Sequence, residues 1–423
     1  MVQDNTSLLA RYKSVRRQTV ALTEGLAAED LCAQSMPDAS PAKWHLAHTT
    51  WFFETFLLQK FQSQFCWHNE SFCFLFNSYY DSVGDRHARP QRGLLTRPYL
   101  QEVMTYRSVI DEAMCQLIES RDQDIEALVT IGLHHEMQHQ ELLLTDLLHL
   151  FSFNPTNPAV IHANRQAIKP DVSIPEMKMK AFDGGLIDVG AESDSTGNWS
   201  TFSYDCEQPR HQSYLMPFKL GTRLVANAEW IDFINDGGYG NPLLWLSDGW
   251  AVKNKENWQA PLYWETRDDV WWQFGLDGLQ QVDQRAPVHH VSFYEADAFA
   301  RWSGKRLPRE FELEHVAESR PISGNFLESH TCRPFSANTS GGDFEDIYGD
   351  VWEWTQSAYS AYPGFDPKQG ALGEYNGKFM ANQFVLKGGS CVTPRLQLRA
   401  SYRNFFYPHQ RWQFSGLRLA EDY

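Results

Sequence analysis

The sequence predicts an α-helical bundle followed by a domain that mixes helices with strands. Within residues 1–152, apolar side chains recur at the three- and four-residue spacing of amphipathic helices. Residues 153–176 interrupt this spacing with several prolines, so we expect a linker there. Residues 177–423 carry short strand-like runs and many glycines. A length of 423 residues fits a division into two or more domains.

The first part is predicted to form a four-helix bundle. Each expected helix shows a stripe of apolar residues, and the helices cover residues 8–26, 41–61, 98–117 and 124–151. We expect Ser40 to cap the second helix, with Pro41 at its first position. An aromatic-rich connection over residues 65–97 is too long to be a simple loop. Bundles with such a crossover build metal sites from side chains that face their cores.

The second part is predicted to combine strands with a helix. Residues 184–190 (GGLIDVG) are typical of a strand between two turns. A helix is expected after Ser292, because Ala296, Phe299 and Trp302 fall on one face of it. The predicted fold class is therefore α for the first part and α+β for the second.

Composition limits the partners of the protein. A formal net charge of −16 argues against nucleic acid and anionic membranes, because both bind clustered lysines and arginines. The seven cysteines are scattered, without the C-x-x-C spacing of a zinc knuckle, which is typical of a reducing cytosol. The sequence contains neither an apolar leader nor an apolar run of membrane-spanning length. We therefore expect a cytoplasmic protein without a membrane partner.

The most informative motif lies in the fourth expected helix. His135 and His139 are four residues apart and share one helix face, where both can bind one metal ion. With Glu136 between them, the stretch also matches H-E-x-x-H, the motif of zinc peptidases. However, no glutamate follows at the distance that one peptidase class requires, and Leu142 and Thr145 replace the glycine and histidine of another. Because Glu136 also points about 100° away from His135, we interpret the peptidase match as coincidental.

A histidine of the second expected helix completes the predicted metal site. His48 lies among Trp44, Trp51 and Phe52 on that helix. Three histidines would bind the metal and leave further positions open for substrate. His45, three residues earlier, competes for this role, and its alternative is a surface histidine near the helix start.

Two further groups lie in the long connection. Tyr79 and Tyr80 are candidates for a proton donor near the metal, and the alternative is a pair of packed loop aromatics. Arg86 and Arg89 either clamp a substrate carboxylate or belong to a solvated charged turn. Spacing alone does not distinguish these alternatives.

Several sequence blocks resemble known families. Four blocks of the second part resemble the formylglycine-generating-enzyme (sulfatase-modifying factor) fold, a C-type-lectin-like domain: RLPREFELE (306–314), GDVWEWT (349–355), LKGGS (386–390) and GLRLA (416–420). The first part resembles a DinB-like four-helix bundle. Residues 44–52 (WHLAHTTWF) and 133–141 (LHHEMQHQE) look like the iron motifs of the ergothioneine-biosynthesis iron(II)-dependent sulfoxide synthases. The combination, which covers nearly the whole chain, resembles that enzyme family.

The resemblance implies a cofactor and a reaction. Iron(II) would be held by His48, His135 and His139, which suits a metal that accepts imidazole and thiolate ligands. The substrates would be O2, a cysteine-type thiol and Nα-trimethylhistidine (hercynine). The reaction would join sulfur to the imidazole C2 atom of hercynine and leave a sulfoxide.

The resemblance also implies substrate-binding residues. Gln138, Asn404 and Phe405 match positions that hold the trimethylammonium group and carboxylate of hercynine. Arg86 and Arg89 match the pair that holds the thiol substrate.

Departures from the family pattern bear on the thiol substrate and on the proton donor. Relatives that use γ-glutamylcysteine carry an acidic and a basic residue where this chain has Phe406 and Gln410, which implies free cysteine as the thiol donor. Their catalytic tyrosine falls near Leu372, and we count Tyr375, three residues later, among the substrate-binding residues. Because this chain lacks the family's catalytic tyrosine, Tyr79 or Tyr80 is expected to supply the proton.

Other functions remain open at this point. Nearby alternatives are selenoneine formation and ovothiol synthesis, although ovothiol enzymes usually carry an appended methyltransferase and this chain ends at Tyr423. More distant ones are a zinc hydrolase, a DinB-type thiol transferase or a non-catalytic lectin-like binding protein. Metal content and substrate-dependent O2 uptake separate these classes.

Overall fold

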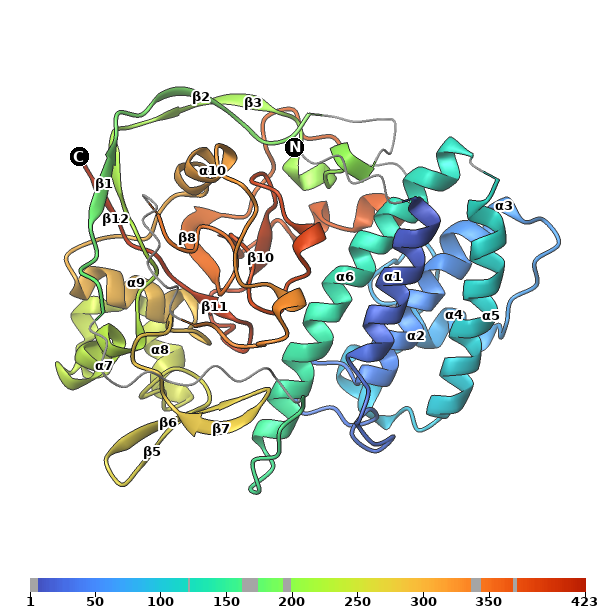
Figure 1. Cartoon of the computed structure of the whole chain (residues 1–423), viewed down its shortest axis with the longest axis horizontal. Helices are drawn as coiled ribbons and strands as arrows, with labels where there is room; N and C mark the ends of the chain where they lie inside the picture. Colours follow the sequence, from blue (N-terminus) through green and yellow to red (C-terminus); the bar gives the residue numbers. More distant parts are fainter. Residues whose placement is uncertain (1–6, 121, 162–173, 193–198, 336–343, 368–370) are drawn as a thin grey trace. The chain divides into compact units, whose positions relative to one another are not determined.

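A computed structural model describes residues 7–120, 122–161, 174–192, 199–335, 344–367 and 371–423 of the protein. The chain divides into two structural units (Figure 1). The first contains Met1–Asn154, Ser193–Ser203 and Pro367–Gly377, and the second contains Pro155–Glu192, Tyr204–Asp366 and Lys378–Tyr423. Two short stretches from beyond residue 154 therefore belong to the first unit. Residues 162–173 of the predicted linker lie outside the described residues.

Helices form most of the first unit. Its α-helices are α1 (Leu8–Ala21), α2 (Ala42–Phe53), α3 (Gln59–Phe61), α4 (Ser71–Phe76), α5 (Leu100–Ile118) and α6 (Gln123–Ser152). A π-helical turn, Glu54–Leu58, joins α2 to α3, and a 3-10 helix, Arg89–Leu94, precedes α5. Helices are present in all four of the predicted ranges, and α1, α2, α5 and α6 pack on one another (Figure 1). Among the described residues, no helix is both long enough and apolar enough to cross a membrane.

The predicted Ser40 cap is not observed. Helix α2 begins at Ala42, with Pro41 at the cap position and no capping bond from a side chain. The Ser40 hydroxyl instead accepts a hydrogen bond from Arg92 (2.9 Å), and its backbone N–H donates to Asp146 of α6 (2.8 Å). The start of α2 is thereby tied directly to α6.

Helix α2 lies in the interior of the first unit. All 12 of its residues are buried, including the large side chains Trp51, Phe52 and Phe53. Tyr106 and Ile110 of α5 are buried as well. Burial of each large apolar side chain stabilises the folded state by about 1.5–3 kcal/mol. Polar side chains on α2 are consequently held in a dry, fixed environment.

The described part of the second unit combines short helices with small sheets. Its α-helices are α7 (Asn227–Asn235), α8 (Ser247–Lys255), α9 (Phe293–Trp302) and α10 (Glu310–Glu318). Its strands are β1 (Met179–Phe182), β2 (Gly185–Val189), β3 (His211–Leu215), β4 (Phe218–Gly221), β5 (Trp264–Arg267), β6 (Val270–Gly275), β7 (Gly278–Gln281), β8 (Trp352–Ala358), β9 (Phe384–Lys387), β10 (Asn404–Phe406), β11 (Ser415–Gly416) and β12 (Ala420–Asp422). The strand expected at 184–190 and the helix expected after Ser292 are present as β2 and α9.

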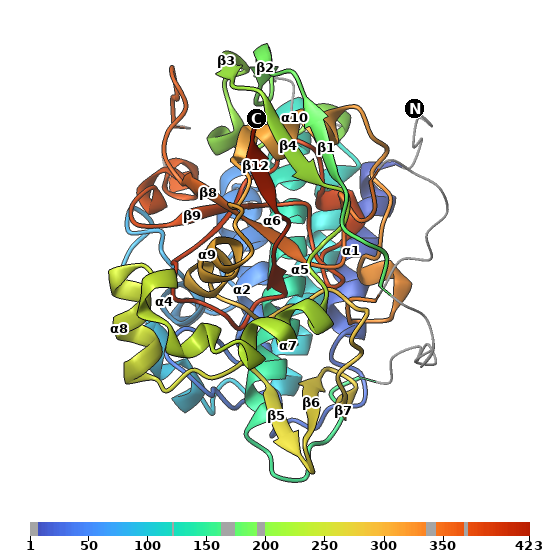
Figure 2. The same cartoon turned by 90° about the vertical axis from the view of Figure 1, so that its left-hand side faces the viewer.

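Within the described residues, the strands of the second unit pair in four sheets. The strand orders are β1-β4-β12, β10-β9-β8-β11, β2-β3 and β5-β6-β7. Figure 2 shows β1, β4 and β12 side by side, and β4 pairs antiparallel with both neighbours. Trp352 and Trp354 of β8 are buried, and the Trp354 indole donates to the Val291 carbonyl oxygen just before α9 (2.9 Å). Strand β8 is therefore part of the core of this unit.

Candidate metal centre

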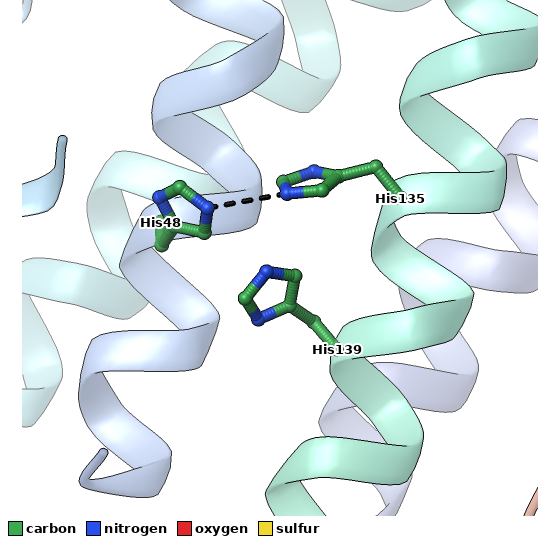
Figure 3. Close-up of side chains that lie close together, drawn as sticks. All are labelled: His48, His135 and His139. Atoms are coloured by element: carbon green, nitrogen blue, oxygen red, sulfur yellow. Dashed lines mark hydrogen bonds between the residues drawn. The ribbon is translucent and has the colours of Figure 1, made fainter. Parts of the chain in front are cut away.

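Three buried histidines meet between α2 and α6 in the first unit (Figure 3). His48 projects from α2, and His135 and His139 project from α6 (Figure 3). One ring nitrogen of each histidine lies within 4.8 Å of the others. The exposed fractions are 0% for His48, 1% for His135 and 7% for His139. The structure thus brings together the three ligands predicted from the sequence.

A hydrogen bond donated by Nδ1 leaves Nε2 available on His48. Its Nδ1 donates to the Phe76 carbonyl oxygen (2.6 Å), so the lone pair lies on Nε2. This Nε2 is 3.2 Å from Nε2 of His135 (Figure 3). Two nitrogens bound to one tetrahedral ion at about 2.1 Å lie about 3.4 Å apart, so the observed separation suits a shared cation.

Aromatic rings enclose the histidine triad, which is the cluster of His48, His135 and His139. His48 is stacked between Trp44, with ring centroids 4.5 Å apart, and Trp51, at 5.5 Å. Phe52 packs on His135 at 4.8 Å. These contacts restrict the ring orientations and keep water from the α2 side of the site.

Burial keeps the three imidazoles neutral. It lowers the pKa of His48 and of His139 well below the ordinary value, and the neighbouring histidines lower both further. The pKa of His135 falls to about 3, chiefly through burial. Because a metal ion binds the neutral imidazole, the triad is ready for ligation at neutral pH.

His45, the competing third ligand, lies behind the triad. Its Nδ1 atom is 2.8 Å from Nδ1 of His139, and its Nε2 atom is 3.0 Å from Asp146. Both ring nitrogens of His45 are therefore engaged with side chains of α6. The structure separates the two candidates by their partners, and His48 is the one in the cluster.

Glu136 lies on a neighbouring side of α6 and takes no part in the triad. Its carboxylate accepts hydrogen bonds from Arg16 (2.9 Å), Arg107 (3.0 Å) and the Thr19 hydroxyl (2.7 Å). Burial alone would raise the pKa of Glu136, but Arg16 and Arg107 lower it to about 2. A carboxylate held in this way is a poor general base, which supports the interpretation of the peptidase motif as coincidental.

Tyr375 approaches the triad from the stretch Pro367–Gly377. Its hydroxyl donates to the side-chain oxygen of Gln138, and its ring centroid lies 5.7 Å from that of His135. Two residues predicted to bind substrate are therefore a hydrogen-bonded pair beside a predicted ligand. The side chain of Leu372, where the family tyrosine was expected, lies outside the described residues.

The other two predicted tyrosines lie farther along the same aromatic cluster. The Tyr79 ring lies 6.1 Å from that of Tyr375 and 4.7 Å from that of Tyr80. Tyr80 is fully buried and packs on Trp51 at 5.7 Å, and Trp51 in turn stacks on His48. Aromatic contacts thus link both tyrosines to the triad through an intermediate ring.

The predicted arginines lie on the connection between α4 and α5. Arg86 forms an ion pair with Asp81, and the two side chains are 41% and 66% exposed. Arg89 donates to a backbone carbonyl oxygen. A third arginine in the same spacing, Arg92, was missed; it is buried and lies over Trp44, 3.5 Å from the ring centroid. Its i+3 spacing after Arg89 was the available signal.

The remaining predicted substrate residues belong to the second unit. Asn404, Phe405 and Phe406 form β10, which pairs antiparallel with β9. Gln410 accepts a hydrogen bond from the backbone N–H of Tyr407 (3.0 Å). Their role in binding substrate stays a prediction.

Two stretches remote in sequence contact α6 and the connection between α4 and α5 in the first unit. The His134 ring is stacked between Trp199, with centroids 4.7 Å apart, and Phe202, at 4.0 Å. Glu374 accepts a hydrogen bond from the backbone N–H of Ser82 (2.9 Å). No spacing in the sequence connects these partners, so sequence reasoning missed them.

Comparisons with known proteins find relatives over the whole chain. A model of the sulfatase-modifying factor enzyme 1-like domain matches residues 165–325 and 320–423, and a DinB superfamily model matches residues 11–143. The chain is 31% identical over 439 residues to a hercynine oxygenase of Mycobacterium tuberculosis, covering 98% of both proteins. It is 29% identical over 453 residues to a hercynine oxygenase of Mycolicibacterium thermoresistibile, covering 100% of this chain and 96% of the relative.

A shorter match extends the comparison to a fungal protein. Over 237 residues the chain is 25% identical to ergothioneine biosynthesis protein 1 of Schizosaccharomyces pombe, covering 52% of this chain and 28% of that protein. The full-length relative at 31% identity and the two matched domains decide the assignment. With a DinB superfamily domain followed by a sulfatase-modifying factor domain, the chain belongs to the hercynine oxygenase family.

Proposed function

We propose that this chain is an iron(II)-dependent sulfoxide synthase that joins the thiol of cysteine to C2 of hercynine in ergothioneine biosynthesis. The observation that carries the proposal is the buried triad of His48, His135 and His139, in a chain that matches a hercynine oxygenase over its full length. The fold we propose with this function is a DinB-like four-helix bundle joined to a C-type-lectin-like domain.

The triad fits a divalent metal ion of the iron type. The cluster found among the described residues holds three neutral imidazoles and no carboxylate. The Nε2 atoms of His48 and His135 are 3.2 Å apart, and a cation between them would use both lone pairs. Imidazole is a suitable ligand for iron, and three protein ligands leave positions open for substrates.

The reaction we propose balances without a further reductant. When bound, iron(II) supplies a centre at which O2 and a thiolate are activated together. The imidazole C2–H bond and the thiol S–H bond break, and a C–S bond and an S–O bond form. O2 accepts four electrons; one oxygen atom stays on sulfur and the other leaves as water.

The residues around the triad would bind hercynine and handle the proton. Gln138 lies one residue before His139 and accepts a hydrogen bond from Tyr375, which supports a contact with the imidazole substrate. Tyr375, Tyr79 and Tyr80 are the candidates for the proton donor. The 5.7 Å separation between the Tyr375 and His135 rings favours Tyr375 among them.

Cysteine is the thiol donor we propose. Phe406 and Gln410 carry no charge, and Gln410 is 9% exposed and hydrogen-bonded within the chain. Neither side chain can form an ion pair with a γ-glutamyl arm. Arg86 and Arg89, in contrast, carry guanidinium groups of the kind that binds a cysteine carboxylate. All seven cysteines of the protein are free thiols, which supports our expectation of a cytoplasmic enzyme acting on small molecules.

Metal analysis combined with O2 uptake tests this function. The protein is purified without oxygen and loaded with Fe(II), with Zn(II)-loaded protein as the matched control. We expect O2 uptake that requires both hercynine and cysteine, with a product heavier by one oxygen than the thioether. Full Zn(II) occupancy as purified, with no substrate-dependent O2 uptake after Fe(II) loading, would contradict the proposal.

Competition between thiols tests the substrate assignment. With hercynine held constant, kcat/KM is measured for cysteine, γ-glutamylcysteine and selenocysteine, and histidine replaces hercynine in a parallel series. We expect cysteine with hercynine to give the highest value. A higher kcat/KM for γ-glutamylcysteine would overturn the inference from Phe406 and Gln410, and preference for histidine or selenium would favour an ovothiol or selenoneine synthase.

A further inference from the structure

A chain of hydrogen bonds runs behind one ligand of the triad. Asp146 Oδ2 lies 3.0 Å from His45 Nε2, and His45 Nδ1 lies 2.8 Å from His139 Nδ1. The exposed fractions of His45 and Asp146 are 2% and 7%. Water therefore has little access to these hydrogen-bonded side chains.

Each hydrogen bond in the series Asp146–His45–His139 has one possible direction when His45 is neutral. The Asp146 carboxylate only accepts, and the same oxygen already receives the Ser40 backbone N–H at 2.8 Å. His45 Nε2 must then carry the proton and donate it to Asp146, which leaves a lone pair on His45 Nδ1. His139 Nδ1 consequently donates to His45, and the lone pair of His139 lies on Nε2.

We propose that Asp146 and His45 are positioning residues that hold His139 in the Nδ1–H tautomer and thereby direct its Nε2 lone pair to the metal. The inference rests on the proposed metal site but adds to it two residues that are not ligands. A carboxylate or carbonyl behind a ligating histidine fixes the ring and raises its basicity as a ligand.

The two helices supply this support from the same faces that supply the ligands. On α6, Asp146 follows His139 by seven residues, so both side chains lie on one face of the helix. On α2, His45 precedes His48 by three residues and also shares its face. One pair of helix faces therefore carries both the ligands and their support.

The three ligands differ in what lies behind them. His48 is held by the neutral Phe76 carbonyl oxygen (2.6 Å), whereas the chain behind His139 ends in a carboxylate. Nδ1 of His135 has no hydrogen-bond partner among the described residues. His139 is thus the ligand that depends on side chains, and removing them should release its tautomer.

Two substitutions at His45 form the first matched pair. His45→Phe removes the acceptor for His139 and keeps a ring of similar size. In His45→Gln the carboxamide oxygen can accept from His139 while its nitrogen donates to Asp146. The glutamine variant should therefore preserve the hydrogen bonds between His139, residue 45 and Asp146, which the phenylalanine variant removes.

Two substitutions at Asp146 form the second pair. Asp146→Ala removes the acceptor, so His45 is free to move its proton to Nδ1 and force the proton of His139 onto Nε2. Asp146→Asn keeps an oxygen that can accept from both His45 and Ser40. If either pair contains a variant that fails to fold, the other pair decides.

The decisive measurements are Fe(II) affinity and the tautomer of His139. Competition with a chelator should show affinity about 10–100-fold weaker for His45→Phe and Asp146→Ala, the loss typical of an outer-shell partner. His45→Gln and Asp146→Asn should stay within about threefold of the wild type, below that range. In metal-free protein with ¹⁵N-labelled histidine, NMR should show His139 protonated at Nδ1, and Asp146→Ala should shift the proton to Nε2.

Controls separate this inference from the metal site itself. His149 is half-buried on α6 and contacts Ser35 (2.6 Å), so His149→Phe should leave Fe(II) affinity unchanged. Equal affinity within each matched pair, whether unchanged or weakened, would overturn the positioning role and leave the proposed function intact. If His48→Ala, His135→Ala and His139→Ala all bind Fe(II) like the wild type, the metal site and the proposed function fail together.

Discussion

Two neighbouring sides of helix α6 use buried polar residues in opposite ways. On one side, Glu136 is held by two arginines and a threonine hydroxyl. On the other, His135 and His139 turn ring nitrogens toward His48, and no carboxylate belongs to that cluster of described residues. A buried polar group whose hydrogen-bond partners all come from the protein has a structural role. Ring nitrogens whose lone pairs converge can instead bind a metal ion.

The Glu136 side joins four helices. Arg16 comes from α1 and Arg107 from α5, and both pair with the same carboxylate of α6. Arg16 also pairs with Asp111 (2.6 Å), and Arg107 donates to the Leu46 carbonyl oxygen of α2 (2.8 Å). This side, which we call the closed side, stabilises the packing of the helices. The side that carries His135 and His139 is called the open side.

The largest effect is expected from breaking the closed side. Glu136→Gln leaves Arg16 and Arg107 buried with less negative charge, which should lower the free energy of unfolding by about 3–5 kcal/mol. Urea unfolding followed by circular dichroism measures this change. Fe(II) bound per folded molecule should stay the same, and a loss of stability below about 1 kcal/mol would contradict the closed-cluster interpretation.

Acid provides an internal control for that substitution. The pKa of Glu136 is depressed from its ordinary 4.5 to about 2, so its contribution to stability is complete above pH 4.5. The contribution is lost as pH falls from 4.5 toward 2, because the unfolded state then binds the proton first. The stability difference between wild type and Glu136→Gln should therefore shrink over this pH range, and a constant difference would argue against the assignment.

Breaking the open side should affect metal binding. His48→Ala, His135→Ala and His139→Ala should each weaken Fe(II) affinity by at least about 100-fold, because even an outer-shell partner is worth 10–100-fold. Chelator competition and metal analysis measure the change. Full iron retention in all three variants would refute the ligand set.

The tyrosines test which group near the open side delivers a proton. Tyr375→Phe should lower the ratio of sulfoxide to side product at least about tenfold, a modest part of the 10²–10⁴ typical of a positioned acid. Tyr79→Phe and Tyr80→Phe serve as matched controls, and product analysis by mass spectrometry gives the ratio. If only Tyr79→Phe or Tyr80→Phe changes the ratio, the donor is the tyrosine predicted from the sequence and not Tyr375.

A pair of glutamines gives the smallest and most selective comparison. Gln138 contacts Tyr375, whereas Gln140 donates to the Val15 carbonyl oxygen (3.0 Å) and the Thr19 hydroxyl (3.0 Å) on the Glu136 side. Gln138→Met should raise KM for hercynine about 3–10-fold, the worth of one hydrogen bond, without lowering stability. Gln140→Met should lower the unfolding free energy by about 1–3 kcal/mol and leave KM unchanged. The reverse pattern would mean that the two sides were assigned wrongly.

Local spacing explains why much of the site could be predicted. The pair His135 and His139 follows from the geometry of one helix, and so does its separation from Glu136. His48 followed from its aromatic neighbours on α2, but spacing could not rank it against His45. Their difference depends on Asp146 of another helix, which no local pattern reveals.

The rest of the site depends on where distant segments return. Tyr375 contacts an α6 residue 237 positions before it in the sequence, and Trp199 contacts one 65 positions before it. A pattern of spacing within a segment carries no information about the surface on which that segment packs. The Gln138–Tyr375 bond and the stack on His134 could therefore be found only in the folded chain.

The discontinuous build of the first unit limits how this protein can be shuffled. A fragment that stops at residue 154 keeps all three histidines but loses Tyr375, Trp199 and Phe202, which contact Gln138 and His134. Exchanging the C-terminal portion with that of a relative would replace those same side chains. Recombination at residue 154 therefore changes the side chains that contact α6 beside the predicted metal ligands.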